Sequence, residues 1–328
     1  MDGQHRLSLP LEVGLTAAIV SVLDEEPMSL VVRPAEAVSE PALPSGSFDP
    51  LKHRTFEIGL RNWVTEQTGV PLGYVEQLYT FGDRGRHAQV GDRDPHVISV
   101  GYLALTRAGS RDVDAATGAR FRSWYHFFPW EDWRSGRPSQ LDGIILPGLS
   151  RWSEKAEGEE RLARSDRVRR LFGDGAMFDD ETVLERYELL YDAGLVAEAQ
   201  RDGRESVLEQ QALAQAPLAP LGESMRFDHR RILATAMGRL RAKMKYRPVI
   251  FELMPELFTL TDLQRRVEAI SGRHLHKQNF RRLVESSAVV EPTGDMLHAT
   301  GGRPAALFRF RRDVLQERPS PGLRVGGR

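Results

Sequence analysis

The stretch FTLTDLQRRVEAISGRHLHKQNFRRLVESSAVVEPTGDMLHATGGRPAALFRFRRD, from Phe258 to Asp313, has the clearest structural pattern in the chain. It predicts helix, turn, helix, strand, glycine-containing loop and strand, which is the element order of a winged helix-turn-helix. Thr261 is the expected N-cap of the first helix, with Gln264 at capping-box spacing, and Gly272 is the expected left-handed stop. One face of this helix is apolar: Leu263, Val267 and Ile270.

The expected second helix, residues 277–286, separates apolar from polar side chains. Phe280, Leu283 and Val284 share one face, which would dock on the first helix. The opposite face carries side chains suited to DNA base edges, with Asn279 near its border: Lys277, Gln278, Asn279, Arg281 and Arg282. Arg303 lies in the expected hairpin tip, residues 300–304, where it would suit a phosphate or a narrow minor groove.

Charge is unevenly distributed along the chain. From Arg226 to Arg312 there are 18 Lys and Arg against 8 Asp and Glu, a balance of +10. The whole chain has 45 basic and 46 acidic residues, which leaves 27 against 38 elsewhere, a balance of −11. This separation favours a DNA-binding surface confined to the C-terminal part over a basic face that binds protein.

The composition is that of a globular protein. Its 328 residues are enough for two domains with separate cores, and 41% of them are hydrophobic. No apolar run approaches the roughly 20 residues that span a bilayer, and the first residues lack the pattern of a signal peptide, so a cytoplasmic location is expected. The absence of cysteine excludes disulfides, thiolate catalysis and cysteine zinc sites. His274 and His276 are expected to face solvent or phosphate rather than a metal.

The N-terminal part predicts several strands and one amphipathic helix, which together favour an α+β sandwich of about 150 residues. The helix, residues 51–67, has Phe56, Leu60 and Val64 on one face and Gly69 as its stop. A turn is expected at residues 24–27. The expected strands are residues 15–23, 28–33, 75–81 and 96–106.

The aromatic segment, SWYHFFPWEDWRSGRP at residues 123–138, stands out in the middle of the chain. Trp124, Trp130 and Trp133 suit packing in a core or between two subunits, which we favour, or a platform that stacks on a nucleotide base. The sequence leaves the role of this segment open.

The second half of the chain predicts helices up to the winged segment. They are expected at residues 153–171, 179–191, 207–216 and 227–246. The last is a basic amphipathic helix with Asp228 as its cap and an apolar face of Leu233, Met237, Leu240 and Met244. Pro217, Pro220 and Gly222 favour a domain boundary within residues 214–222.

The segment LPSGSFDPLKHRTFEIGLRNWVTEQTGV, Leu43 to Val70, resembles the Nudix box, which runs G-x5-E-x7-R-E-U-x-E-E-x-G-U with U a bulky aliphatic residue. The matching positions are Val64, Glu66, Gly69 and Val70. The departures fall on charged positions of the motif: Arg54, Asn62, Trp63 and Gln67. Because Nudix hydrolysis needs Mg²⁺ held by several carboxylates, we expect no catalytic residue and no metal site. The alternative is an active pyrophosphohydrolase of ADP-ribose-like substrates that uses carboxylates outside the motif.

YVEQLYTFGD (residues 74–83) and GDRDPHVISVGYLAL (residues 91–105) resemble the NrtR-type regulators, as do FDHRRILATAMGRL, HKQNFRRL and GRPAALFRF further on. The aromatic segment and the long middle part make the chain more similar still to the NadQ type, which regulates NAD metabolism in alphaproteobacteria. The resemblance implies a transcriptional repressor of NAD biosynthesis or salvage genes that binds operator DNA as a homodimer. It implies no required cofactor and no membrane partner, and an adenine nucleotide (ADP-ribose, NAD or ATP) as effector.

The same resemblance divides the chain into parts. A Nudix-like α/β/α sandwich at 1–150 would sense the metabolite, and a helical connector at 151–222 would lead to the winged helix-turn-helix at 223–313. Residues 314–328 would form a disordered tail.

The effector pocket implied by the resemblance has aromatic side chains to stack on the adenine and arginines to bind the phosphates. The expected set is Glu66, Gln77, Tyr79, Phe81, Asp83, Arg84, Arg86 and Arg93. For Tyr79 and Phe81 the alternative is ordinary strand packing, and for Arg93 it is an ion pair with Asp92 or Asp94. Whether the effector releases or strengthens DNA binding stays open.

Overall fold

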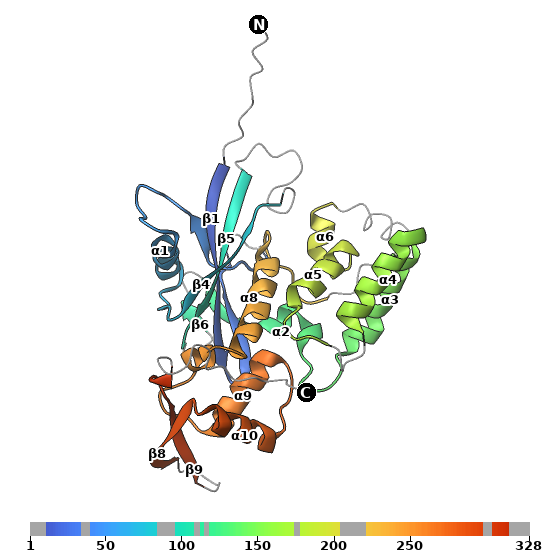
Figure 1. Ribbon diagram of the computed structural model, residues 1–328. Coiled ribbons are helices and arrows are strands. Elements are labelled where there is room, and N and C mark those ends of the chain that lie inside the picture. Colours follow the sequence, from blue (N-terminus) through green and yellow to red (C-terminus); the bar gives the residue numbers. More distant parts are fainter. Residues whose placement is uncertain are drawn as a thin grey trace.

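The computed structural model describes residues 11–33, 40–83, 96–107, 112–114, 118–173, 178–203, 221–297 and 304–314. Within them the N-terminal part is a seven-stranded sheet in the order β4-β5-β1-β2-β7-β6, with β3 paired to β1 (Figure 1). β1 and β5 run parallel and the other neighbours antiparallel. The strands are β1 (Leu11–Leu23), β2 (Glu26–Val31), β3 (Ser45–Ser47), β4 (Val75–Phe81), β5 (His96–Leu105), β6 (Asp112–Asp114) and β7 (Ala119–Ser123). The strands predicted from the sequence are confirmed.

The turn between β1 and β2 is tighter than the predicted 24–27. Asp24 and Glu25 form it alone, with φ angles of 49° and 62°. Two residues with positive φ match the right-handed twist of antiparallel strands, so Glu26 already belongs to β2.

Helix α1 (Phe56–Thr68) covers one face of the sheet and buries Leu60 and Val64 there. It begins later than the predicted 51–67 because Thr55 caps it, its Oγ1 accepting from the Ile58 amide at 3.3 Å. The predicted stop is confirmed, since Gly69 is left-handed with φ 65°.

Helix α8 (His229–Met244) covers the opposite face (Figure 1). Its predicted apolar positions are all buried, but so are Arg230 and Arg241, at 1% and 0% exposure. The predicted basic amphipathic helix is present, and these two of its arginines lie in the interior. Asp228 stands at the N-cap position without a side-chain cap bond, and its carboxylate lies 3.6 Å from Arg231 instead.

The connecting region is helical. The predicted helix 153–171 is two helices, α3 ending at Glu154 and α4 beginning at Gly158, whose φ of 56° turns the chain between them. The elements of the connecting region are α2 (Trp124–Phe127), η1 (Pro129–Glu131), η2 (Leu141–Ile145), α3 (Leu146–Glu154), α4 (Gly158–Phe172), α5 (Val183–Asp192) and α6 (Ala197–Arg201). The predicted helix 207–216 and most of the predicted boundary 214–222 lie outside the described residues, and the domain limits stay predictions.

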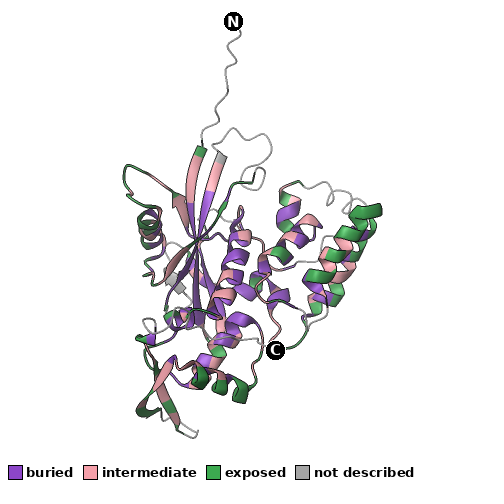
Figure 2. Cartoon of the chain, in the orientation of Figure 1, coloured by how far each residue is buried: buried purple, intermediate pink, exposed green. Residues whose placement is uncertain are grey.

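Most of the aromatic rings in this segment are buried, while His126 and residues 135–137 are exposed; Figure 2 colours the chain by burial. Trp124 and Trp130 are 0% exposed and belong to one apolar cluster with residues of the sheet, α5, α8 and the winged part. Trp133 is partly buried, its ring centroid 4.9 Å from that of Phe178. The core-packing interpretation of these tryptophans is confirmed.

The C-terminal part has the predicted element order. It consists of η4 (Val249–Leu253), α9 (Leu260–Ser271), α10 (Lys277–Ser287) and the antiparallel strands β8 (Val290–Leu297) and β9 (Ala305–Phe310). Val314, the first residue of the predicted tail, is buried, and residues 315–328 lie outside the described part. No helix in the described part of the chain has the length and apolar character needed to cross a bilayer.

Candidate nucleic-acid interface and effector site

Helix α10 presents a polar face to solvent. Its apolar side docks through Phe280 and Val284, which are buried. The predicted DNA-contacting residues of this helix are all exposed: Lys277, Gln278, Asn279, Arg281 and Arg282. The arrangement leaves a helix face free to enter a major groove, which is wide enough to admit an α-helix.

The turn between α9 and α10 is fixed by side chains. Gln264 Nε2 donates to Leu275 O and to Glu268 Oε1, both at 2.9 Å, and Glu268 Oε1 accepts from the Leu275 amide at 2.8 Å. The predicted cap was therefore wrong: Thr259 caps α9 in a capping box with Asp262, and Gln264 braces the turn. The predicted stop at Gly272 is confirmed, with φ 72°.

Two features of the α10 face were not predicted. Arg282 Nη2 donates to Asn279 Oδ1 at 2.6 Å, which orients its guanidinium along the helix. Glu285 is exposed on the same face, four residues after Arg281. Its spacing in the sequence was the available signal, and a carboxylate there can accept a hydrogen bond from a cytosine amino group.

Two arginines of the wing bear on DNA binding: Arg309 lies among the described residues, and Arg303 does not. Arg309 of β9 donates to Glu291 of β8 at 2.6 Å, so this cation is matched within the hairpin. Arg303, predicted at the tip, lies outside the described residues. His274 and His276 are exposed beside the start of α10, and His274 Nδ1 lies 3.5 Å from Glu268.

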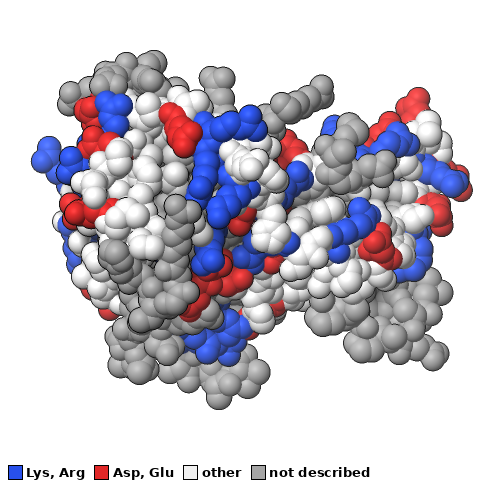
Figure 3. Space-filling view, turned by 90° about the horizontal axis from the view of Figure 1, so that it is seen from below, with Lys and Arg blue, Asp and Glu red and all other residues white. Residues whose placement is uncertain are grey.

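Much of the predicted basic excess is neutralised within the protein. Six cations of α8 and its end have carboxylate partners in the N-terminal part and connector, and these pairs are Arg230–Glu198, Arg231–Glu188, Arg239–Glu76, Arg241–Glu131, Lys243–Glu76 and Lys245–Asp180. The DNA-binding surface is thus smaller than the charge count indicated. Figure 3, a view from below, shows several Lys and Arg side chains gathered near the middle of this face beside acidic side chains, with others scattered toward its edges.

On α1, two side chains at positions aligned with the Nudix box, Trp63 and Gln67, form hydrogen bonds to the backbone of β3. Trp63 Nε1 donates to Ser47 O at 2.9 Å. Gln67 Nε2 donates to Ser45 O at 2.7 Å, and its Oε1 accepts from the Ser45 amide at 3.2 Å. Both residues therefore have structural contacts that a carboxylate could not reproduce, because a carboxylate cannot donate. Glu66 is exposed beside them.

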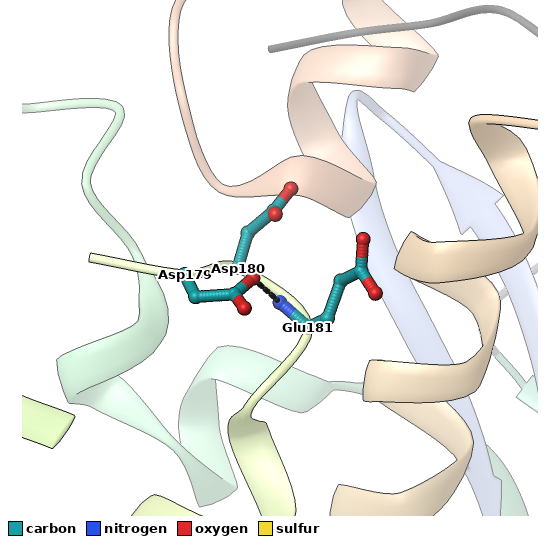
Figure 4. A group of neighbouring side chains, drawn as sticks. All are labelled: Asp179, Asp180 and Glu181. Carbon is teal, nitrogen blue, oxygen red and sulfur yellow. Dashed lines mark hydrogen bonds between the residues drawn. The ribbon is translucent and has the colours of Figure 1, made fainter. Parts of the chain in front are cut away.

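Among the described residues, a group of three neighbouring acidic side chains lies away from α1. Asp179, Asp180 and Glu181, just before α5, have carboxylate oxygens within 4.8 Å of one another (Figure 4). Lys245 forms ion pairs with two of them: its Nζ lies 2.9 Å from Asp180 and 2.6 Å from Glu181. This group is a loop anchor, remote in sequence from α1.

The predicted effector residues of β4 divide between the two faces of the sheet. Gln77 accepts from Tyr102 Oη at 3.4 Å on the α1 side. Phe81 is 5% exposed and packs in the α8-side core, which confirms the strand-packing alternative for this residue. Tyr79 is 55% exposed, and Asp83 is paired with Arg231. The other three, Arg84, Arg86 and Arg93, lie outside the described residues.

Sequence reasoning missed the cations that accompany β4. Arg231 of α8 sits over the Phe81 ring at 5.3 Å, and Arg239 over the Tyr79 ring at 5.9 Å. Lys243 Nζ lies 2.6 Å from Glu76. No local pattern signals these contacts, because more than a hundred residues separate the partners.

Comparison with known proteins now adds to this geometry. Residues 250–310 match the NrtR DNA-binding winged helix domain. A curated relative, the ADPR responsive transcriptional repressor NtrR of Acinetobacter baylyi, is 48% identical over 84 residues, which is 26% of this chain and 33% of that protein. The match thus spans about a third of the length of the relative.

Solved structures share the fold. Shewanella oneidensis NrtR, complexed with a 27mer DNA, aligns over 93% of this chain and 95% of its own, with a TM-score of 0.52 and 18% identity. A MutT/nudix family protein from Enterococcus faecalis aligns over 93% and 89%, with a TM-score of 0.51 and 14% identity. The predicted Nudix-like sandwich followed by a winged helix is confirmed as a fold, and the resemblance to NrtR is confirmed for the winged segment.

Proposed function

We propose that this protein is a metabolite-responsive transcriptional repressor of NAD biosynthesis or salvage genes. The observation that carries the proposal is the exposed polar face of α10 within a segment that matches the NrtR DNA-binding winged helix domain. Arg281 and Arg282 would read guanines, Gln278 would read adenine, and Lys277 would contact phosphate. A homodimer would place two such helices one DNA turn apart.

The proposed effector is an adenine nucleotide, with ADP-ribose first because the Acinetobacter baylyi relative is named for its response to ADPR. NAD and ATP are the alternatives. The exposed edge strand β4 supports binding there, since Gln77 and Tyr79 are both accessible. Tyr79 would stack on the adenine, Glu66 would border the site, and the arginines that follow β4 in the sequence would bind phosphate. Phe81 and Asp83 would support the strand.

The nucleotide would be bound without being cleaved. Trp63 and Gln67 support this, because at Nudix-box positions they hold β3 through hydrogen bonds instead of offering carboxylates to Mg²⁺. Incubation with Mg²⁺ and ADP-ribose tests the point: intact ADP-ribose is expected, and steady release of AMP would establish a hydrolase instead.

The test of the whole proposal is fluorescence anisotropy with duplexes from the upstream regions of NAD-pathway genes. Tight binding to one duplex and weak binding to a scrambled duplex are expected, with a change on adding ADP-ribose. The test variant is Arg281→Ala, on the exposed face of α10. The matched control is Arg309→Ala on the wing, where the guanidinium is already paired with Glu291. Equal affinity for all duplexes, or equal loss in both variants, would contradict sequence-specific recognition by α10.

A further inference from the structure

The last turn of α9 is completed by groups from outside the helix. The last four carbonyls of any α-helix have no partner within it. Around α9, Tyr125 Oη donates to Ala269 O at 2.6 Å, Arg241 Nε to Ile270 O at 2.8 Å and the Trp133 amide to Gly272 O at 2.7 Å. Burial raises the pKa of Tyr125 to about 12, so its hydroxyl keeps the proton that it donates. The aromatic segment and α8 therefore fix where the first helix of the winged part ends.

A buried carboxylate ties these donors together. Arg186 of α5 donates to both oxygens of Glu131 at 2.6 and 2.7 Å, and Arg241 of α8 donates to the same carboxylate at 2.8 Å. All three side chains are 0% exposed. Charges out of water are tolerated only with such partners, and the negative end of α9 favours the cation of Arg241. The aromatic segment, α5, α8 and the end of α9 consequently form one unit.

The same segment also contacts the sensory sheet. It continues directly from β7, and Ser123 Oγ donates to Glu26 at 3.0 Å. Arg134 donates to the Glu26 carboxylate at 2.7 Å and to Glu25 O at 2.9 Å, both at the β1–β2 turn. One side of the aromatic segment thus holds the β1–β2 turn, and the other holds α9.

α9 packs directly against β2, but between the turn itself and the start of α9 there is an open pocket. A cavity of about 180 Å³ separates them, lined by Val22, Asp24, Glu25, Asp262, Arg265 and Arg266. It is bridged by Arg265 and Glu25 at 2.5 Å, two side chains that are about half exposed. Exposed ion pairs add little stability. The buried contacts of the aromatic segment therefore give the β1–β2 turn a second connection to α9, beside the packing of β2 on that helix.

We propose that the aromatic segment is the connection through which the sensory sheet sets the position of the winged helix, with Tyr125 and Glu131 as positioning residues. The inference rests on the proposed function and specifies its regulation. An effector that changes the sheet would displace Glu25 in the turn and Glu26 at the start of β2, and Arg134 and Tyr125 would carry the displacement to the end of α9. A ligand acts in this way only through its different affinity for the two arrangements.

The test compares two single-hydroxyl deletions. Tyr125→Phe removes the bond to Ala269, whereas Tyr191→Phe removes a part-buried bond of 2.8 Å to Asp202, away from α9. The readouts are the ratio of operator affinities with and without ADP-ribose, and hydrogen exchange of the α9 amides with and without ADP-ribose in the absence of DNA. Effector ratios of roughly 5- to 150-fold are typical. Tyr125→Phe is expected to lower the ratio by about five-fold, the equivalent of one hydrogen bond, while Tyr191→Phe keeps it.

The outcomes separate the inference from the proposed function. An unchanged ratio and unchanged α9 exchange response in Tyr125→Phe overturn the inference, even if the wild type is a normal repressor. Failure of the wild type to bind operator DNA overturns the proposed function, and the exchange readout then still decides the inference. If hydrogen exchange of the α9 amides in the wild type does not change on adding ADP-ribose, the inference is overturned as well. Should Tyr125→Phe not fold, Arg134→Lys, which keeps the charge but loses the second contact to the turn, carries the same expectation.

Discussion

Replacing Glu131 by Gln removes the carboxylate charge that Arg186 and Arg241 share. The side chain keeps its size, so the packing around it is preserved while two fully buried guanidinium groups lose their counter-charge. Removing one partner of a buried ion pair typically costs about 3–5 kcal/mol. Because two cations depend on this one carboxylate, we expect Glu131→Gln to lower the free energy of unfolding by at least about 3 kcal/mol at neutral pH.

The loss should depend on pH in a defined direction. Burial alone would raise the pKa of Glu131, but Arg186 and Arg241 outweigh it, so the pKa is lowered from its ordinary value of 4.5. A carboxyl group whose pKa is lower in the folded state stabilises fully above its unfolded pKa and loses that contribution as the pH falls through the folded pKa. The stability gap between wild type and Glu131→Gln should therefore persist at neutral pH and narrow below 4.5.

Urea denaturation followed by tryptophan fluorescence measures this gap, since Trp130 lies next to Glu131 in the chain. The matched control is Glu291→Gln, which breaks the exposed pair with Arg309 and should cost about 0–1 kcal/mol. A Glu131→Gln loss as small as that of the control, or a gap that widens in acid, would refute the view that this carboxylate holds the junction together.

Three further predictions concern the other sites. Arg281→Ala should weaken operator binding by about 1–3 kcal/mol and relax specificity at one base pair, as read by anisotropy against duplexes changed one position at a time. Gln67→Glu should lower the unfolding free energy by about 1–3 kcal/mol, because Ser45 O loses its donor; an unchanged denaturation midpoint would count against a stabilising role of this hydrogen bond. Tyr79→Ala should weaken ADP-ribose binding in calorimetry while leaving stability nearly unchanged, since the ring is 55% exposed.

The winged helix could be predicted from sequence because its signals are local. Apolar residues at helical spacing and a glycine stop after Ser271 settle the α9–α10 pair without reference to the rest of the chain. The cap was misplaced by two residues because TLTD offers two threonines, and the capping box uses Asp262 where the usual rule looks for Glu or Gln.

The burial of α8 could not be predicted in the same way. Its sequence shows cations but not their partners, and the pairs are distant: 110 residues separate Arg241 from Glu131. Charge counting therefore assigned to a DNA-binding surface several groups that lie in the interior. The side of the sheet on which each β4 residue lies could not be predicted either. The alternation along β4 is broken by a register shift between Gln77 and Thr80, which only the strand pairing reveals.

The hydrogen bonds between α1 and β3 bear on how the chain can change over time. Placing acidic residues at positions 63 and 67 of α1 would remove the hydrogen-bond donors that Trp63 and Gln67 offer to Ser47 O and Ser45 O. Each such mutation weakens the fold before any metal is gained, because Mg²⁺ binding requires several carboxylates at once. Single substitutions of this kind would each lower stability, so gaining a carboxylate cluster on α1 would need compensating mutations elsewhere first.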